Sequence, residues 1–440
     1  MKRNLSLILA FILTAALVLG GCSSTGNSGG SGAGTPDNSG SGDAAPSSQP
    51  VEVVVWHTFS DHQLEAFQAI VDDYNASQSE VKVVSQTQAW DDFDEKLMQA
   101  VRNGTGPDIA LDYAATVANY LSDGFVTNLT PYITDSEIGI EGFQDKVAPG
   151  IYKEATQFDE AGSVYIMPVV TTGTVFYYNK TMYDELGLSA PATWDELVSN
   201  CEKIKAEKGA MGFGFDNLVD GAQILLMQSG IQYYNKSSNT VDINAPAAVE
   251  TYDWFARQIG AGLFKLQPDG YFESEFAAGD IAGYVTSVAS APYVEDAVAG
   301  NFEIGVAAIP QGDTAWAPAW NRGAIVFNSD EATQRAAYLF LKYFTGEEVN
   351  AQWCVDFGAL SAYPAVNESA KMQELLADDA ALTALSAGLE DVGYIPAFNG
   401  SNTVREEISK ALQETATGLK TAQQALQDSA DICNAELAGK

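Results

Sequence analysis

The chain has 440 residues, of which 46% are hydrophobic, and it carries 58 acidic against 22 basic side chains. The formal charge of −36 argues against nucleic acid or anionic lipid as a partner. The four cysteines and two histidines show neither zinc-site spacing nor a disulfide framework, so we expect no metal and no cofactor.

The first residues have the pattern of a secretory signal. A basic start is followed by an apolar run from Leu5 to Leu19, which is too short for a membrane span. Leu19-Gly20-Gly21-Cys22 resembles a lipobox, so we expect a signal peptide over 1–21 and lipidation of Cys22. The acyl chains would anchor the protein at the extracellular face of the cell membrane. The alternative is ordinary signal cleavage that leaves a spare thiol.

Residues 22–50 consist mainly of Ser, Gly, Thr, Asn, Ala and Pro. Such a stretch cannot bury enough apolar surface to fold, so it predicts a flexible tether. Roughly 390 residues follow from Val51, which is too long for one usual core and suits two lobes.

Strands and helices alternate after Val51. The apolar patterns predict strands over 51–56, 81–84 and 109–111, with helices between them, the first of which is opened by a capping box from Ser60 to Gln63. A βαβ series of this kind predicts an α/β fold with mostly parallel sheets flanked by helices.

The stretch from Ser163 to Glu196 is expected to cross between the lobes. Val164–Met167 predicts a short strand that ends at Pro168, and residues 174–178 predict a second strand. Thr193 and Glu196 then form a capping box that opens a helix. This punctuated crossover is what a hinge would need.

The end of the chain predicts two amphipathic helices, the first of which is lined by Val404, Ile408 and Leu412. Cys433 falls on the apolar face of the second helix, and Cys201 falls on an earlier helix. Both cysteines are interpreted as small core residues rather than reactive thiols.

The order of these segments resembles the family 1 extracellular solute-binding proteins, which are the ligand receptors of bacterial ABC importers and are related to the maltose-binding protein. The matching segments are strand-WH-T ending at Thr58, GPDI at 106–109, YYNK at 177–180 and TWDEL at 193–197. The resemblance extends over 51–440.

The resemblance implies a two-lobe fold of the type II periplasmic-binding-protein kind, with a hinge between the lobes. Lobe 1 is expected over 51–166 and 315–358, and lobe 2 over 167–314 and 359–440. It also implies a monomeric receptor, not an enzyme, that captures a carbohydrate and delivers it to ABC permease membrane subunits.

Aromatic side chains occur in the turns beside amides and hydroxyls. A sugar ring has an apolar C–H face and a hydroxyl edge, which aromatic and polar groups satisfy respectively. The bland alternative is that most of these rings fill cores or the lobe interface. The candidate ligand contacts are Trp90, His57, Tyr113, Thr171, Thr172, Ser290, Trp320, Arg322, Gly323 and Tyr394.

The chain is most similar to the glycerol-3-phosphate-binding branch of the family. Trp90 corresponds to an aromatic ligand contact of that branch, and Thr171 with Thr172 to its Ser pair. That branch also has an Arg before its tail helix, whereas residues 395–402 hold none before Arg405. We therefore expect a neutral sugar, with glycerol 3-phosphate or another polyol phosphate as the alternative. A secreted glycoside hydrolase and a surface adhesin are the further alternatives.

Overall fold

The computed structural model describes residues 49–267, 270–389 and 392–439. The expected signal peptide, the lipidation site Cys22 and nearly all of the expected tether therefore lie outside the described residues. Within the described part, no helix is both long enough and apolar enough to cross a membrane.

The predicted βαβ series is confirmed. The first strand pairs in parallel with the second and with the third. Each connection between them contains a helix, which buries its apolar stripe against the sheet. The elements are β1 (Val51–His57), α1 (Asp61–Ser77), β2 (Val81–Thr87), α2 (Phe93–Arg102), β3 (Ile109–Asp112) and α3 (Ala114–Leu121). The capping box predicted at Ser60 does not form, since Ser60 makes no side-chain cap and Gln63 donates instead to the Phe357 carbonyl.

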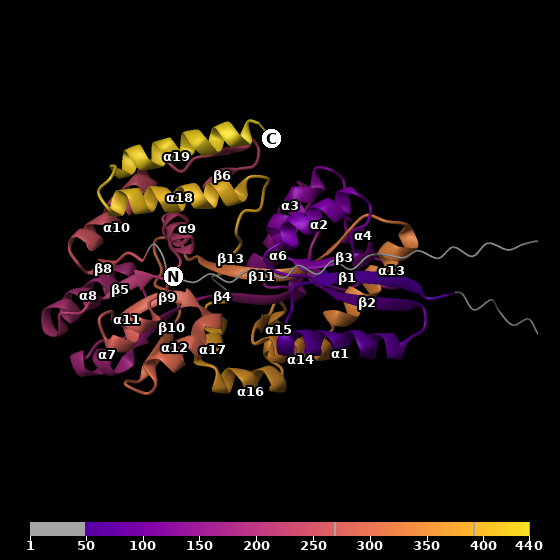
Figure 1. Cartoon of the computed structure of the whole chain (residues 1–440), viewed down its shortest axis with the longest axis horizontal. Coiled ribbons are helices and arrows are strands. Elements are labelled where there is room, and N and C mark those ends of the chain that lie inside the picture. Colours follow the sequence, from indigo (N-terminus) through magenta and orange to yellow (C-terminus); the bar gives the residue numbers. More distant parts are fainter. Residues whose placement is uncertain (1–48, 268–269, 390–391, 440) are drawn as a thin grey trace, which may run out of the picture. The chain divides into compact units, whose positions relative to one another are not determined.

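Two long strands cross the middle of the sheet, β4 (Met167–Asn179) and β11 (Ala317–Val326), and they pair antiparallel (Figure 1). The predicted strand end at Pro168 is wrong, because Pro168 lies inside β4. It pairs with Gly323 next to the point where the register with β11 shifts, and proline is tolerated at such an irregularity.

The main sheet has the strand order β2-β1-β3-β11-β4-β9-β5-β8, with three short strands paired beside β4 and β11. Parallel pairs form both ends, and the antiparallel pairs of β4 and β11 join them. The other strands are β5 (Phe213–Phe215), β8 (Phe264–Lys265), β9 (Gly283–Ser287), β10 (Ile304–Ala307), β12 (Leu360–Ser361), β13 (Val392–Gly393) and the hairpin β6 (Tyr234–Asn235) with β7 (Thr240–Val241).

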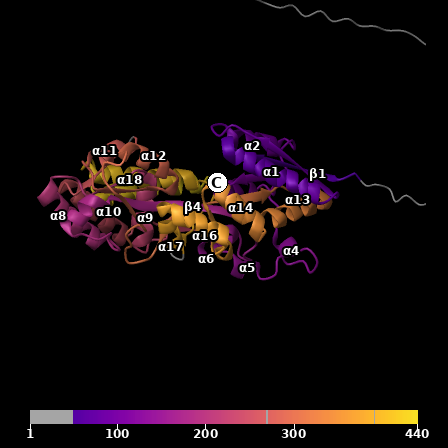
Figure 2. The same cartoon turned by 90° about the horizontal axis from the view of Figure 1, so that it is seen from below.

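The helices gather in two groups on either side of the crossing strands (Figures 1 and 2). Near β1 lie α1, α2 and two more helices, α13 (Glu331–Phe344) and α14 (Glu347–Phe357). At the opposite end lie α8 (Trp194–Lys208), α10 (Pro246–Gly260), α18 (Ser401–Ala416) and α19 (Ala422–Leu437). The remaining helices are α4 (Thr130–Ile133), α5 (Phe143–Lys146), α6 (Pro149–Thr156), α7 (Lys180–Leu186), α9 (Leu218–Gln228), α11 (Glu273–Ala278), η1 (Val288–Ser290), α12 (Ala291–Val298), α15 (Pro364–Asn367), α16 (Ala370–Asp378) and α17 (Ala380–Ala387).

The buried apolar residues form two clusters, here called the first core and the second core. The first core contains the strands β1–β3, and the second contains the tail helices α18 and α19. The first core also contains Phe272, Phe276, Tyr284, Val294 and Val298, which were expected in lobe 2. Buried residues between Leu360 and Leu385 belong to the first core, although lobe 2 was expected to resume at 359. The lobe boundaries therefore stay a prediction.

In the second core the burial of two cysteines is confirmed, and the capping box predicted at Thr193 forms in part, because the Glu196 carboxylate accepts from the Ala192 N–H and not from that of Thr193. Thr193 accepts a hydrogen bond from the Glu196 backbone N–H at 3.2 Å and so caps α8. Cys201 and Cys433 are both buried among apolar neighbours. Burial also raises the pKa of the Cys433 thiol to about 12, which keeps it protonated.

A buried carboxyl group ties α6 to the crossing strand β11. Asn321 of β11 donates from Nδ2 to Oε2 of Glu154 on α6, and the Asn321 Oδ1 is buried with no partner among the described residues. Burial raises the pKa of Glu154 to about 8. The folded chain therefore favours a protonated Glu154 at neutral pH. Its O–H group could donate to the Asn321 Oδ1, which has no other partner among the described residues.

Glu154→Gln should flatten the pH dependence of stability. The folded state keeps the Glu154 proton up to about pH 8, whereas the unfolded state loses it near the usual value of 4.5. Stability from this proton is thus complete below about pH 4.5 and is lost as the pH rises to about 8. Between pH 5 and 8 the free energy of unfolding of the wild type, measured by denaturant titration, should fall by on the order of 2–4 kcal/mol more than that of the variant.

The exposed Glu160 provides the matched control, because Glu160→Gln should keep the wild-type slope. Equal slopes for the wild type and Glu154→Gln would show that Glu154 does not titrate in this range.

Candidate functional site

Arg322 of β11 sits among four aromatic rings. Its guanidinium carbon lies 5.2 Å from the ring centre of Tyr113 and 5.4 Å from that of Phe59. The rings of Trp90 and Phe357 follow at 5.5 and 5.9 Å. These distances fit cation–π contacts, which stabilise the positive charge of the guanidinium in place of a carboxylate. We call Phe59, Trp90, Tyr113, Trp320, Arg322 and Phe357 the Arg322 cluster.

The fold explains why residues so far apart in sequence meet there. Phe59, Trp90 and Tyr113 occupy the turns that follow β1, β2 and β3, and the carboxyl ends of parallel strands lie at one edge of a sheet. Trp90 is 60% exposed, so its ring is available to a ligand. The described structure thus brings the predicted residues Trp90, Tyr113 and Arg322 together.

Arg322 keeps unused hydrogen-bonding capacity. Its Nη2 donates to the Tyr113 hydroxyl at 3.3 Å, and its Nε is buried with no partner among the described residues. It also makes no ion pair within the described ranges. A guanidinium in this condition can donate to the hydroxyl or anionic oxygens of a ligand.

Trp320 joins the Arg322 cluster to the second core. Its ring packs edge-on against Tyr113, with ring centres 6.3 Å apart. The guanidinium of Arg405, in the second turn of α18, also lies 4.8 Å from the Trp320 ring centre. Arg405 pairs at 3.4 Å with Asp220 of α9, whose pKa burial raises to about 6. Both cores therefore supply polar groups to the space around Trp320.

His57 packs against Phe59 of the cluster and is not exposed to a ligand. Its side chain is fully buried, its Nδ1 accepts from the Phe59 N–H at 3.2 Å, and its Nε2 lies 2.8 Å from the Ser85 hydroxyl. Burial, followed by the charge of Arg322, lowers the pKa of His57 to about 4. His57 is thus a neutral core residue in this structure, which does not fit its prediction as a ligand contact.

Thr172 and Thr171 point to opposite faces of β4. Thr172 pairs with Trp320 in the sheet and donates to the Trp320 carbonyl at 3.5 Å, so it borders the Arg322 cluster. Thr171 pairs with Asn321 and is fully buried. Only Thr172 of this pair lies on the side of the cluster.

Gly323 and Ser290 have local roles in the described structure. A side chain at Gly323 would meet Ile166 and the Met167 carbonyl within 3 Å, so packing accounts for the glycine. Ser290 lies at the start of α12, and its hydroxyl is 3.0 Å from that of Thr286. Neither residue makes a hydrogen bond or ring contact with the Arg322 cluster among the described residues.

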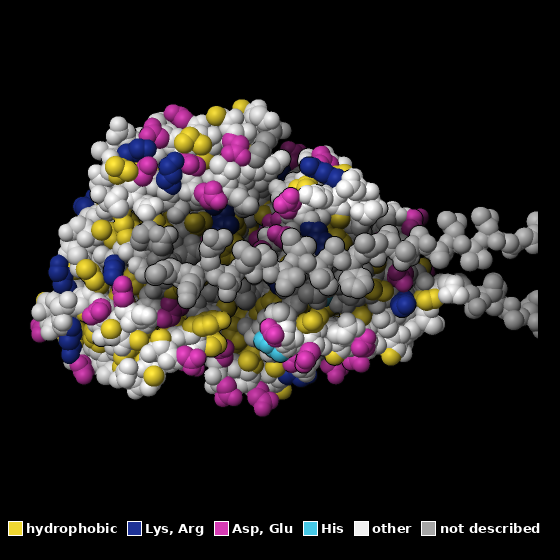
Figure 3. Space-filling model, in the orientation of Figure 1, with side chains coloured by type: hydrophobic (Ala, Val, Ile, Leu, Met, Phe, Trp, Pro, Cys, Tyr) yellow, Lys and Arg dark blue, Asp and Glu magenta, His cyan; other side chains and the backbone are white. Residues whose placement is uncertain are grey.

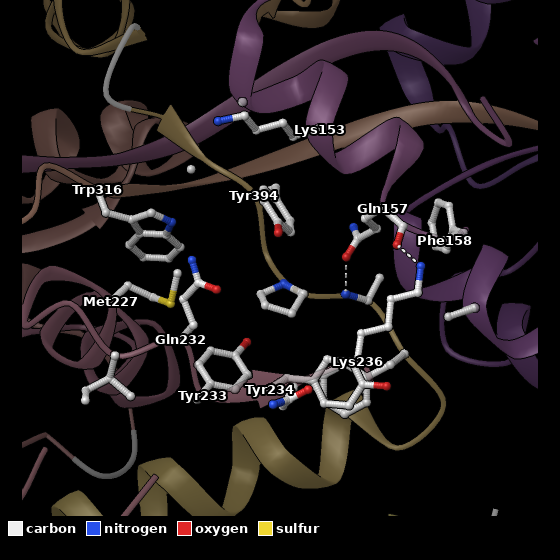
Figure 4. Close-up of a pocket in the computed structure, with 18 of the residues that line it drawn as sticks. Lys153, Gln157, Phe158, Met227, Gln232, Tyr233, Tyr234, Lys236, Trp316 and Tyr394 are labelled. Carbon is white, nitrogen blue, oxygen red and sulfur yellow. Dashed lines mark hydrogen bonds between the residues drawn. The ribbon is translucent and has the colours of Figure 1, made fainter. Parts of the chain in front are cut away.

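Tyr394 belongs to a different place. It lines a cavity of about 1130 Å³ whose wall residues include Lys153, Gln157, Tyr234, Trp316 and Phe398 (Figure 4). Figure 2 shows α6, which carries Lys153, on one side of β4, and α2 and α12 on the other. Among the described residues, the wall contains no member of the Arg322 cluster, so Tyr394 and that cluster line different spaces.

Sequence reasoning missed Phe59, Phe357 and the contact of Arg405 with Trp320. Phe59 could have been found, since it follows a parallel strand in the same way as Trp90 and Tyr113. Phe357, at the end of α14, carries no such signal. Among the described residues, no group of three or more His, Cys, Asp or Glu side chains could hold a metal ion.

Comparisons with known proteins identify the family of the chain. Residues 69–384 match the family described as bacterial extracellular solute-binding protein. In structure, the chain is similar to the cyclic alpha-maltosyl-1,6-maltose binding protein of Arthrobacter globiformis, with a TM-score of 0.78 and 25% identity over 89% of this chain and all of that one.

Two of the relatives that are similar in sequence bind different ligands. A maltotriose-binding protein of Pyrococcus abyssi is 25% identical over 70% of this chain and 65% of its own length. A periplasmic sn-glycerol-3-phosphate-binding protein of Yersinia pseudotuberculosis is 23% identical over 86% of this chain and 90% of its own length. The chain has the two-lobe α/β fold of maltose-binding-type receptors, and it belongs to the family of bacterial extracellular solute-binding proteins.

Proposed function

We propose that this chain is the substrate-binding lipoprotein of an ABC importer and that it captures a neutral mono- or oligosaccharide at the Arg322 cluster. The observation that carries the proposal is the grouping of Trp90, Tyr113 and Trp320 around Arg322, with Arg405 of the second core on Trp320. Such rings stack on the C–H face of a sugar, while the guanidinium groups donate to its hydroxyls. The relatives that bind maltotriose and cyclic maltosyl-maltose support this ligand class.

Capture would proceed by closure of the two lobes. The crossing strands β4 and β11 belong to both halves of the sheet, so small backbone changes there reorient one core against the other. Ligand favours the closed arrangement only to the extent that it contacts both cores in that arrangement. The permease subunits would then receive the closed, loaded receptor.

A polyol phosphate is the second candidate ligand. Arg322 has no ion pair among the described residues, and the chain is similar to a glycerol-3-phosphate-binding protein. The acidic excess of the chain opposes a phosphate dianion, which is why we favour the neutral sugar.

Trp90→Ala should weaken sugar binding without loss of cooperative folding, because Trp90 is exposed and carries little of the core. Stacking and burial of one indole contribute on the order of 1–3 kcal/mol, or roughly 5- to 150-fold in affinity. Calorimetry with maltotriose checks this loss, and Leu419→Ala, at another exposed apolar residue, should bind as the wild type does. Tighter binding of glycerol 3-phosphate than of every neutral sugar tried would select the phosphate candidate instead.

Saturating sugar should compact the receptor. Small-angle scattering with and without maltotriose measures the radius of gyration, which closure would reduce. A radius that stays constant at saturation would speak against closure as the mechanism.

Cys22→Ala should release the protein from the membrane and leave its fold unchanged, because the acyl chains are the proposed anchor. Fractionation of cells that express either form compares the membrane and soluble pools. A variant that still partitions with membranes would show that the lipobox interpretation is wrong.

A further inference from the structure

The cavity that contains Tyr394 differs in charge from the rest of the molecule. Acidic side chains outnumber basic ones by 58 to 22 in the chain, and Figure 3 shows them scattered over the visible face. Yet the described residues that line the cavity include two lysines, Lys153 and Lys236, and no Asp or Glu. The described residues of the wall therefore carry a positive excess, in a chain of formal charge −36.

Neither lysine side chain pairs with a carboxylate of the described residues. Among these residues the Lys236 ammonium donates only to the Gln157 carbonyl, at 2.9 Å, and the Lys153 side chain makes no hydrogen bond or ion pair. Lys153 comes from α6, beside the first core, and Lys236 follows β6, beside the second. The two ammonium groups thus lie at opposite ends of one cavity (Figure 4).

Part of the wall is aromatic. Tyr234 and Phe398 stack in parallel, with ring centres 3.6 Å apart and planes 7° apart, and Tyr394 lines the same cavity farther from Lys236 (Figure 4). Trp316, only 6% exposed, holds a buried Nε1–H with no acceptor among the described residues. A buried donor without a partner is costly, but this N–H packs against Gly393 and is closed to the cavity, so it is no ligand contact.

Hydrogen bonds of Gln157 connect the segments that form the wall. Gln157 accepts from the Ala397 N–H at 2.8 Å through Oε1, and its Nε2 donates to the Ile395 carbonyl at 3.4 Å. Together with the bond from Lys236, these contacts join α6, the segment after β13 and the residue after β6 (Figure 4). The cavity is therefore largely formed before any ligand enters, which lowers the entropy cost of binding.

We propose that this cavity is a second ligand site, separate from the Arg322 cluster, for a small organic anion whose flat or ring-shaped body lies against the aromatic wall. Lys236, whose ammonium group lies beside Gln157, binds its anionic group, which is a carboxylate or a phosphate, and Lys153 attracts that group from the far end of the cavity. Sugar acids and sugar phosphates have this chemistry. The volume of about 1130 Å³ exceeds what one such molecule needs, so water fills the remainder.

Calorimetry at low ionic strength tests the proposal with three probes, namely glucuronate, glucose 6-phosphate and glucose. At least one of the two anions should bind at this site, and the preferred anion identifies carboxylate or phosphate as the recognised group. Lys236→Ala should weaken that binding by about tenfold or more, as expected for a lost bond to a charged group, and Lys153→Ala should weaken it by less. Both lysines are exposed, so the variants should unfold at the wild-type temperature.

Two control variants separate this site from the proposed sugar site. Lys146→Ala removes an exposed lysine of α5 that does not line the cavity, and Trp90→Ala alters the Arg322 cluster; both should leave anion binding unchanged. Anion binding that Trp90→Ala abolishes and the cavity lysines do not affect would place the anion at the Arg322 cluster and overturn the proposal. Failure of both anions to bind would also overturn it, whatever the result for maltotriose.

Discussion

The antiparallel pairing of β4 with β11 is the constraint on which the rest of the structure depends. Each end of the sheet is built from parallel strands, and only these two strands among the described ones lie between β3 and β9 in the strand order. Their backbone hydrogen bonds hold the relative register of the two ends. The side chains that the strands present are consequently placed with respect to both cores at once.

Alternation along β11 distributes those side chains between two environments. Trp320 and Arg322 face the turns after β1–β3, whereas Asn321 between them faces α6 and Glu154. The proposed sugar site and the buried carboxyl group are therefore attached to consecutive residues of one strand. Electrostatics follow the same division, since Arg322 and Arg405 border one side of the strands and Lys153 borders the other.

Most of the fold could be predicted from local pattern, and the site only in part. The apolar spacing of β1 and α18 is strong enough to fix those elements, but strand pairing overrides the local tendency of Pro168 to end a strand. Trp90 and Tyr113 follow from their position after parallel strands. His57 and Tyr394 do not fit the predicted site, because the face to which a turn residue points depends on how the crossing strands arrange the two cores.

The three cysteines of the described ranges are buried, and burial raises the pKa of each thiol. A thiol-specific reagent in neutral buffer meets none of them as a thiolate at the surface of the folded protein. A pair of fluorophores or spin labels could thus be placed at two introduced surface cysteines, one beside each core, in a form without Cys22 and with the native three left in the sequence. Distances between the cores could then be followed in real time in an otherwise unaltered receptor.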